Sequence, residues 1–564
     1  MVNYTFTNNA SIPIMKNIKT VLVCLILFVS PSITFAKENL SETEKLAATA
    51  QVWGFLKYYH PTVAKGKFNW DEELFKILPK AKKAENKAQL SQIFIDWIDH
   101  LGKVGKCKKC NQDQEYEYFG KNFDLLWMEN NKVFSSELTE KLKYIEDNRH
   151  QGKKHYVTQS KKVRNIKIKN EIDYKDFNWK DENLRLLSLF RYWNIVEYFF
   201  PYKYQTDTDW NEVLNTMIPK FLYPETETEF HLAMLELIVS VDDSHAGYFS
   251  KKTNAFFGGY WISAGFRLID QNAVITGFFN DSLATIDDLR VGDVITKVDG
   301  RGVWEIFKER EIYITGSNIS RKKYMAFRSV FNGNTESVQI EYVRDGEIYS
   351  KSIRRYLFEE FNYKKKEKEP VKILDGNIGY LNMGVIKNKD VEEVMKALND
   401  TKAIVFDLRN YPNWTLYPLA YHISSKKNNF FKVTYPDLNY PGKFIWKEGR
   451  QSGSNDGLKY KGKVVILVNE RSQSQSEFTA MCLQTGDNVT TMGSQTSGAD
   501  GNVSRINLVG GFKTGISGIG IFYPDGTETQ RKGVKIDVEV KPTIQGIKDG
   551  RDEVLEKAIE FVGK

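Results

Sequence analysis

The first half of the chain contains an internal repeat, which constrains the fold more than any other feature of the sequence. Shifting the chain by 140 positions aligns residues 52–61 with 192–201, and residues 69–80 with 209–220, without a gap. Both copies space aromatic and aliphatic residues at helical intervals that proline interrupts, which predicts helix–turn–helix units. We expect the two copies to stack their aromatic faces against each other.

The two copies diverge where the alignment ends. Val104-Gly105 of the first copy lies at the positions of Ser244-His245 in the second. His245 therefore stands at the tip of a duplicated scaffold, and a solvated surface histidine is the alternative interpretation. The other histidines lack a comparable setting and are expected at the surface or in the core: His60, His100, His150, His155, His231 and His422.

A second polar segment, Ser472-Gln-Ser-Gln-Ser-Glu477, follows roughly two hundred positions later. Ser474 lies between a β-run at 464–468 and an amphipathic stretch that begins at Phe478. A serine at such a junction can be a nucleophile, and a distant histidine can activate it, since an imidazole has an unperturbed pKa of about 6.5. The alternative is structural, because Ser474 and Glu477 also form a helix-capping pattern. We expect Ser474 and His245 to meet in a serine hydrolase site.

Length and charge narrow the possible functions. A chain of 564 residues with 41% apolar residues predicts about three or four domains with real cores. The net charge of +8 is widely spread, and the densest basic stretch, 153–169, is expected to be a solvated connector. Stacking aromatics do not interleave with a continuous basic face, so we do not expect nucleic-acid binding. No glycine-rich phosphate loop is recognisable, and the expected chemistry needs no cofactor or metal.

The N-terminus has the pattern of an export signal. Residues 15–19 are basic, residues 20–29 are mainly apolar, and residues 32–36 end in small residues suited to cleavage. The apolar run is too short to span a bilayer comfortably, and no second hydrophobic span follows. The sequence therefore predicts a signal peptide over 1–36 and a mature protein without an integral membrane segment, in the periplasm or outside the cell.

Three cysteines follow the predicted signal. Cys107 and Cys110 are spaced for a small disulfide loop, which an oxidising compartment would favour. Unpaired thiols, a metal site and a redox pair are the alternatives, although no second cysteine pair supplies the remaining zinc ligands. Cys482 lies among apolar residues and is expected in the core.

The pattern changes to short β-runs with turns between residues 260 and 356. The phrase from Leu289 to Gly300 resembles PDZ domains, in which an extended peptide adds to a sheet edge and backbone N–H groups hold its carboxylate. The resemblance marks Ser263, Gly265 and Phe266 as the peptide-binding loop. A small β-domain that binds no ligand is the alternative. Residues 364–368 are expected to form a solvated linker.

β-Runs alternate with helical runs after residue 371. The sequence predicts strands at 377–382, 403–409 and 463–468, with a helix at 391–398 and another that carries Ser474. This order is typical of an α/β layer.

Five motifs in this region occur in a fixed order. They are Ile378-Gly-Tyr380, Asp407-Leu-Arg-Asn410, Ser472-x-Ser474-x-x-Glu477, Gly493-x-x-Thr496-x-Gly498 and Gly533-Val-x-x-Asp537. Together with the PDZ-like segment and Asp243-Ser-His245, the chain resembles the C-terminal processing and tricorn-like serine peptidases over roughly residues 180 to 545. The resemblance implies a crotonase-like αβ catalytic core beside a PDZ domain.

The resemblance also points to one branch of that family. The processing branch pairs its serine with a lysine twenty-five positions downstream, where this chain has Ala499. The tricorn-like branch uses a histidine before the PDZ domain, a neighbouring serine, the nucleophile and a late carboxylate. Ser244, His245 and Ser474 match the first three.

Two parts of the family pattern are altered. Gln530 stands where glutamate is frequent, and Glu528 is a candidate substitute two residues earlier, on the same face if the segment is a strand. The family continues Asp-Leu-Arg-Asn into Asn-Pro-Gly-Gly, whereas this chain has Tyr411-Pro-Asn-Trp414. We expect the N–H groups of Gln475 and Asn413 to form the oxyanion hole, with Trp414 as an unusual neighbour.

The predicted fold is a multidomain α+β protein with a duplicated helical N-terminal region. Its expected parts are a signal peptide (1–36), helical copy one with a basic linker (37–165), helical copy two carrying Ser-His (166–255), a PDZ-like domain (256–360) and a crotonase-like serine peptidase core (370–564). The expected function is an exported serine peptidase acting on peptide or protein substrates. A weak or inactive peptide-binding homologue and an esterase are the alternatives, and the sequence leaves the oligomeric state open.

Overall fold

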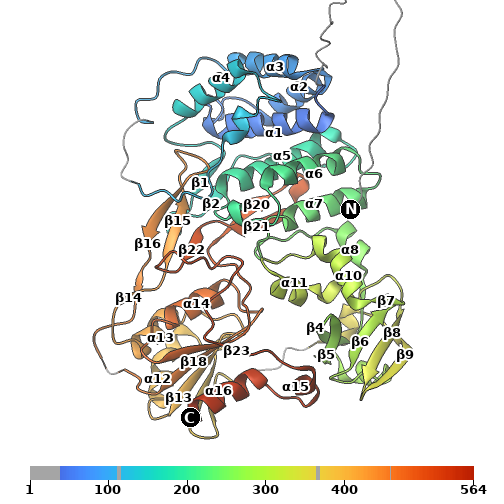
Figure 1. The fold of residues 1–564 in the computed structure, drawn as a ribbon, viewed down its shortest axis with the longest axis vertical. Coiled ribbons are helices and arrows are strands. Elements are labelled where there is room, and N and C mark those ends of the chain that lie inside the picture. The colour runs from blue at the N-terminus through green and yellow to red at the C-terminus, as the bar shows by residue number, and fades with distance from the viewer. Residues whose placement is uncertain (1–38, 111–115, 364–368, 458, 564) are drawn as a thin grey trace, which may run out of the picture. The chain divides into compact units, whose positions relative to one another are not determined.

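The computed structural model of the chain describes residues 39–110, 116–363, 369–457 and 459–563. Leu40–Lys564 forms one compact unit with mixed α and β structure in several layers (Figure 1). The predicted signal peptide and the predicted linker at 364–368 lie outside the described residues. The boundaries expected between domains remain predictions.

The internal repeat folds as two sets of three helices, one helix more than each predicted unit. The first helix of each copy begins and ends 140 positions apart, and the second and third helices also begin 140 apart, at residues 70 and 210 and at residues 87 and 227. The bounds are α1 (Glu42–Tyr59), α2 (Trp70–Lys83), α3 (Lys87–His100), α5 (Glu182–Phe199), α6 (Trp210–Leu222) and α7 (Glu227–Val239).

Each copy is closed by a reciprocal pair of tryptophans. The indole N–H of Trp53 donates to the Trp70 carbonyl, and the indole of Trp70 donates back to the Trp53 carbonyl, both at 3.0 Å. Trp193 and Trp210 repeat the exchange at 2.7 and 3.0 Å. Each buried indole N–H thereby has a hydrogen-bond acceptor, and the same two bonds join the first helix to the second in both copies.

The two copies pack directly on one another, as the stacking prediction expected. Helix α1 contacts α5 and α6 (Figure 1). The approach is close at Gly54, where a β-carbon would lie 1.7 Å from the Asn194 side-chain oxygen. The Asn194 amide donates to the Ala50 carbonyl at 3.0 Å. One hydrophobic core runs through both copies.

Smaller elements complete the helical region. Cys107 and Cys110 form a disulfide in the loop after α3, and Cys482 is buried. The bounds are η1 (Leu126–Glu129), α4 (Ser136–Asp147), β1 (Val157–Gln159), β2 (Ile166–Ile168), η2 (Lys203–Gln205) and α8 (Lys251–Phe257).

The PDZ-like segment forms an antiparallel sheet with its own core. The strand order is β4-β5-β6-β8-β9, with β7 beside β6, so that β4 is an edge strand. The short β-runs predicted for this segment are present and include β5, β6 and β8. The bounds are β3 (Tyr260–Trp261), β4 (Ala264–Ile269), β5 (Asn272–Phe278), α9 (Asp281–Ile286), β6 (Val294–Val298), β7 (Arg301–Gly302), α10 (Val303–Arg310), η3 (Glu311–Tyr313), α11 (Ile319–Met325), η4 (Ala326–Arg328), β8 (Ser337–Arg344), β9 (Glu347–Arg354), β10 (Tyr356–Leu357) and η5 (Phe358–Phe361).

The C-terminal part is built on a six-stranded sheet of order β11-β12-β13-β18-β19-β23. All neighbours are parallel except the β11–β12 pair. The predicted strands and helices are present, and Ser474 follows the carboxyl end of β18. The bounds are β11 (Val371–Leu374), β12 (Ile378–Asn382), η6 (Asn388–Asp390), α12 (Val391–Ala397), β13 (Ala403–Asp407), α13 (Leu416–Ile423), β18 (Lys463–Val468), α14 (Gln475–Leu483), β19 (Val489–Gly493), β23 (Val538–Glu539), α15 (Ile544–Lys548) and α16 (Glu553–Gly563).

Small antiparallel sheets link this layer to the helical region. The β20–β21 hairpin brings Ser517 to the histidine segment of the second helical copy. The bounds are β14 (Asn428–Asn429), β15 (Lys432–Pro436), β16 (Phe444–Glu448), β17 (Gln451–Ser452), β20 (Val503–Asn507), η7 (Val509–Gly511), β21 (Lys513–Ser517) and β22 (Gly520–Phe522).

Candidate active site

Ser474 occupies a strained position at the start of α14. Its backbone has φ 56° and ψ −115°, in the positive-φ region that non-glycine residues rarely adopt. Its hydroxyl forms no hydrogen bond within the described residues. A sharp strand-to-helix turn that leaves a serine hydroxyl unengaged is typical of an exposed nucleophile.

Glu477 holds this turn in shape from inside the protein. One carboxylate oxygen accepts from the Thr496 hydroxyl (2.6 Å) and the Gly498 N–H (2.7 Å). The other accepts from the N–H groups of Ser474 (3.0 Å) and Ala499 (3.1 Å). Burial raises the pKa of Glu477, and the four donors oppose that rise. Only one of the two hydrogen bonds of the predicted capping pattern is therefore present. The Glu477 carboxylate accepts from the Ser474 N–H, whereas the Ser474 hydroxyl accepts no bond from the helix backbone.

His245 lies in the loop after α7, and its ring is oriented by a serine and an aspartate. Its Nδ1 lies 2.9 Å from the Ser517 Oγ and 3.5 Å from an Asp243 carboxylate oxygen. The Ser517 hydroxyl donates to Asp243 at 3.1 Å, so Nδ1–H donates to the hydroxyl oxygen. The proton then resides on Nδ1 and leaves Nε2 as the acceptor. Nε2 is buried and has no partner among the described residues.

Asp243 is a fully buried carboxylate. Burial by itself raises the pKa of Asp243, but the hydrogen bond and positive charge of His245 and the N–H of Ser517 (2.5 Å) lower it below its ordinary value. The ionised carboxylate also accepts from the His245 N–H at 3.0 Å. A charged, immobilised carboxylate beside an imidazole stabilises the imidazolium that forms during acid–base catalysis.

The histidine and serine segments are joined by a hydrogen bond between their preceding residues. The Gln473 side-chain amide donates to the Ser244 carbonyl at 3.2 Å. Ser244 itself donates from its hydroxyl to the Ser497 carbonyl (3.1 Å) and exchanges bonds with Ser317. The Ser244 side chain therefore joins the histidine loop to Ser317 and Ser497 and forms no hydrogen bond with the imidazole.

The structure separates the two candidates for the late polar group. Glu528 binds Lys121 (2.9 Å), Tyr204 (3.0 Å) and Lys532 (3.0 Å), and not His245. Burial by itself raises the pKa of Glu528, but these donors together lower it to about 2. The two candidates do not share a continuous strand, because Glu528 pairs through an isolated bridge.

Gln530 lies closer than Glu528 to residues 472–477, the turn that carries the candidate nucleophile Ser474 and is called the nucleophile turn below. The N–H of the next residue, Arg531, donates to the Gly498 carbonyl at 2.8 Å, and the Ser474 N–H donates to the Ala499 carbonyl at 3.0 Å. The Gln530 side chain is 1% exposed, and neither amide atom has a partner among the described residues. An unpaired buried amide of this kind costs free energy unless water or substrate satisfies it.

Ala499 fills the position at which a lysine was expected for the other catalytic branch. It is fully buried, and both of its backbone groups are engaged by the nucleophile turn. The next residue, Asp500, is also buried, and burial followed by the charge of Glu477 raises its pKa well above its ordinary value.

The oxyanion candidates differ in their placement. Gln475 is the first residue of α14, so its N–H has no intrahelical acceptor and points from the helix start. The Asn413 amide donates to the carbonyls of Gly384 (3.3 Å) and Ile386 (3.1 Å). No hydrogen bond joins Asn413 to the 472–477 turn within the described residues. Its role in an oxyanion hole remains a prediction.

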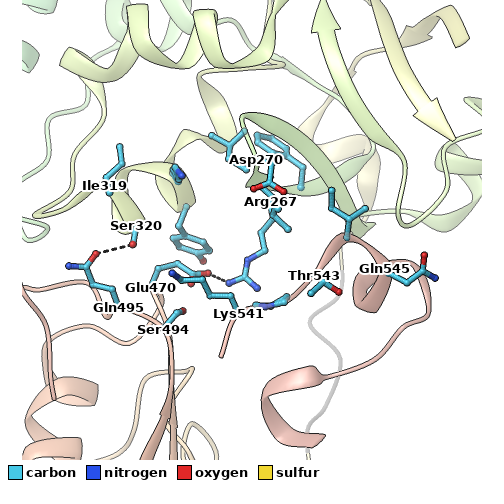
Figure 2. Close-up of a pocket in the computed structure, with 17 residues that line it drawn as sticks. Arg267, Asp270, Ile319, Ser320, Glu470, Ser494, Gln495, Lys541, Thr543 and Gln545 are labelled. Carbon is cyan, nitrogen blue, oxygen red and sulfur yellow. Dashed lines mark hydrogen bonds and ion pairs between the residues drawn. The ribbon is translucent and has the colours of Figure 1, made fainter. Parts of the chain in front are cut away.

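A cavity of about 890 Å³ lies between the sheet that contains β4 and the part of the chain that carries Ser474 (Figure 2). Residues 266–270 of the β4 region and residues of α11 line one side, and Glu470, Gln495 and the 541–545 segment line the other. Arg267 pairs with Glu470, and the Ser320 hydroxyl donates to Gln495 at 3.0 Å. The cavity thus runs along the free edge of β4 and reaches the loop that precedes Ser474.

The predicted peptide-binding residues meet this cavity in part. Phe266 lines it and packs on Phe331. Ser263 is fully buried, and its hydroxyl bonds Asp287 at 3.4 Å. Gly265 lies at a bulge in the β4–β5 pairing. Neither Ser263 nor Gly265 belongs to the lining of the cavity, so peptide contact by these two residues remains a prediction.

Sequence reasoning missed two residues that orient the histidine. Asp243 was visible in the Asp-Asp-Ser-His run, and an acid two residues before a histidine was the signal that could have identified it. No local sequence pattern links Ser517 to His245, because 272 positions separate the two residues.

The described residues lack a recognisable metal site and a membrane-spanning helix. No group of three or more histidine, cysteine or acidic side chains there could hold a metal ion. None of the described helices combines the length and hydrophobicity required to cross a bilayer.

Comparison with known proteins places this fold and site in a class. Residues 377–540 match the model described as Peptidase family S41. A relative from Staphylococcus haemolyticus, described as a "Probable CtpA-like serine protease", is 24% identical over 326 residues, 55% of this chain and 60% of the relative. The match thus spans less than two thirds of the relative's length.

Solved structures agree on the fold. Mature CPAF complexed with lactacystin aligns with TM-score 0.54 and 14% identity over 68% of this chain and 98% of that chain. Mature CPAF alone aligns with TM-score 0.55 and 14% identity over 68% and 97%. At this identity the alignment supports the fold and not the activity. The resemblance to peptidase family S41 thus rests on the match of residues 377–540 and on the curated relative.

Proposed function

We propose that this protein is an exported serine peptidase of the tricorn-like type, which hydrolyses peptide bonds through an acyl-enzyme on Ser474. The observation that carries the proposal is the positive-φ turn at Ser474, whose free hydroxyl follows a residue bonded to the histidine loop. The match of residues 377–540 to peptidase family S41 supports the reaction class.

The proposed reaction uses the ring of His245 as base and then as acid. Nε2 takes the hydroxyl proton while the Ser474 oxygen attacks the scissile carbonyl carbon. The imidazolium returns that proton to the leaving amine as the peptide C–N bond breaks. Water, deprotonated by the same Nε2, then cleaves the acyl-enzyme and regenerates the serine.

Hydrogen-bonding groups of the protein assist the proposed proton transfers and the attack on the carbonyl carbon. Asp243 and Ser517 hold the imidazole through Nδ1, so that Nε2 is the atom available to the substrate side. The N–H of Gln475 at the helix start is the oxyanion donor best supported by position, with Asn413 as a second candidate. A Ser–Lys mechanism is disfavoured because Ala499 replaces the lysine.

The substrate class follows from the edge strand. Strand β4 has an unpaired edge beside α11, and a cavity of about 890 Å³ follows it. An extended peptide can add to such an edge through backbone hydrogen bonds. The PDZ-like segment is thus proposed to hold peptide or protein substrates near the catalytic layer.

Export is proposed on two observations. The N-terminal sequence has the basic, apolar and small-residue order of a signal peptide. The Cys107–Cys110 disulfide is favoured by an oxidising compartment such as the periplasm or the cell exterior.

A binding protein without turnover is the second candidate. Gln530 favours it, because a neutral amide replaces the carboxylate frequent in the family and its buried atoms are unpaired. Trp414 favours it as well, because it occupies a position where glycine is usual. Such a protein would retain the peptide groove and lose catalysis.

A fluorophosphonate probe, which phosphonylates activated serines, distinguishes the two. We expect labelling of the wild type, none of Ser474→Ala, and loss in His245→Ala. Ser136→Ala, which removes an exposed serine from α4, should label like the wild type. Absence of labelling in a protein with a normal melting transition would reject the peptidase and favour the binder. Digestion of an unbiased peptide library then separates a peptidase from an esterase.

A further inference from the structure

Trp414 has a backbone conformation that its side chain disfavours. Its φ is 59°, in the left-handed region that glycine adopts freely and a bulky residue rarely does. Its side chain is 61% exposed. A strained backbone that displays a large apolar ring to solvent is an unusual combination in a folded protein.

Side chains around the loop hold this conformation in place. The Asn413 amide bonds the carbonyls of Gly384 and Ile386. The Asn388 amide donates to the Trp414 carbonyl at 3.3 Å. The backbone on both sides of the tryptophan is thus fixed by neighbours, as is required for a strained residue to persist.

The fold makes little use of the indole ring. Within the described residues, the Trp414 ring takes part in no aromatic pair, no cation–π contact and no hydrogen bond, although its backbone does. By contrast, Trp53 and Trp193 are fully buried and hydrogen-bonded. Glycine would satisfy the same backbone without strain, so the local structure gives no reason for the ring.

The loop that carries Trp414 emerges at the same edge of the sheet as the turn that carries Ser474. Strands β13 and β18 are parallel neighbours, so the segments that follow them emerge at the same edge. The Leu408 carbonyl accepts the hydroxyls of Ser472 (2.7 Å) and Ser476 (2.6 Å), on either side of Ser474. The loop that starts at Leu408 and leads to Trp414 is thereby tied to the nucleophile turn.

We infer that Trp414 is a specificity-determining residue, whose indole contacts a bulky apolar side chain of the substrate beside the scissile bond. Tyr411 is a second exposed aromatic residue of the same loop, with 62% of its surface exposed. The favoured substrates are peptides with an aromatic or large aliphatic residue at one position next to the cleaved bond. This inference rests on the proposed peptidase function and names the substrate class of that site.

The physical reason is desolvation. An indole face and an apolar side chain remove one another from water, and aromatic pairs gain further from their ring geometry. Pocket contacts of this size discriminate substrates by about 10–200-fold. A contact that forms when peptide binds explains why the ring is displayed rather than packed.

Peptide binding to a Ser474→Ala background tests the inference without turnover. Fluorescein-labelled peptides that differ at a single position, phenylalanine against serine, are compared by fluorescence anisotropy. We expect Ser474→Ala to favour the phenylalanine peptide by roughly tenfold at one position, and the added Trp414→Gly to reduce the preference to less than about twofold. Trp414→Phe should retain most of it, and Tyr223→Ala, with an equally exposed ring (64%) in the helical region, should not change it.

The outcomes separate the inference from the proposed function. Because glycine relieves the strain at φ 59°, Trp414→Gly should melt no lower than its parent, so a lost preference is not unfolding. An unchanged preference in Trp414→Gly, an equal loss for all peptides, or no binding of any peptide overturns the inference. Hydrolysis by the wild type and its Trp414→Gly variant, measured separately, tests the proposed function. Binding selectivity without turnover would reject the peptidase, and with it a scissile bond beside Trp414, whereas the contact between the indole and a bound peptide would stand.

Discussion

His245 and Ser517 are hydrogen-bonded, with 2.9 Å between Nδ1 and Oγ, although they lie 272 positions apart in the chain. The Ser517 hydroxyl in turn donates a hydrogen bond to the Asp243 carboxylate, which also accepts hydrogen bonds from two backbone N–H groups. This relay defines which ring nitrogen carries the proton. It links the helical region to the β20–β21 hairpin of the catalytic half.

Removing members of this relay should lower turnover more than substrate binding. We expect Ser517→Ala to reduce kcat by about tenfold and Asp243→Asn by about 10²–10⁴-fold, because the ring loses its orientation and its preferred tautomer. KM should stay nearly constant. Steady-state kinetics with a cleaved peptide measure both, and melting curves check folding. Equal changes in kcat and KM for folded variants would contradict the relay.

The four hydrogen bonds that Glu477 accepts, called the Glu477 clamp here, should be disrupted even by an isosteric substitution. In Glu477→Gln, one oxygen that accepts two donors becomes an NH₂ group that faces them. We expect a loss of about 2–3 kcal/mol in the free energy of unfolding and loss of probe labelling at Ser474. Chemical denaturation and the fluorophosphonate probe measure the two effects. A stable, fully labelled variant would show that the clamp does not hold the nucleophile turn.

The reciprocal tryptophans should contribute equally in the two helical copies. We expect Trp53→Phe and Trp193→Phe each to cost about 1–2 kcal/mol, from one buried hydrogen bond and a small void. Trp127→Phe is the matched control, because that buried indole N–H has no partner among the described residues. Thermal unfolding monitored by circular dichroism compares them. A control that loses as much as the paired positions would exclude the hydrogen bond as the cause.

The Glu528 network predicts a stability change with pH. Because its pKa is about 2 in the folded protein, below the ordinary value near 4.3, its contribution is present above about pH 4.3. That contribution is lost as pH falls toward 2. Glu528→Gln should therefore melt lower than the wild type at pH 7, with the difference shrinking between pH 4 and 2.

The control for this experiment is an exposed glutamate of α4. Glu137→Gln removes one exposed negative charge in the same way and so controls for the change in net charge. If the gap between Glu528→Gln and the wild type instead widens as the solution is acidified, the ion-pair network with Lys121 and Lys532 is not its source.

Much of the fold followed from local patterns in the sequence. The 140-residue repeat predicted the paired helical copies. The alternation of apolar runs predicted β12, β13 and β18 close to their observed bounds, and it predicted a helix at Ser474, where α14 begins one residue later. Periodicity records which face of an element is buried, and burial is the main force that selects these elements. The third helix of each copy was missed, because the aligned segments ended before it.

The sequence by itself determined the residue types of the site: a serine at a strand–helix junction, a histidine at the tip of the second copy, and the missing lysine at Ala499. Only the tertiary structure decided their partners. Ser517 is hydrogen-bonded to His245, and Glu528 is bonded to Lys121 and Tyr204. The Ser244 hydroxyl bonds the Ser497 carbonyl and not the imidazole ring. Hydrogen bonds of this kind depend on distances and angles between distant segments, which local periodicity does not encode.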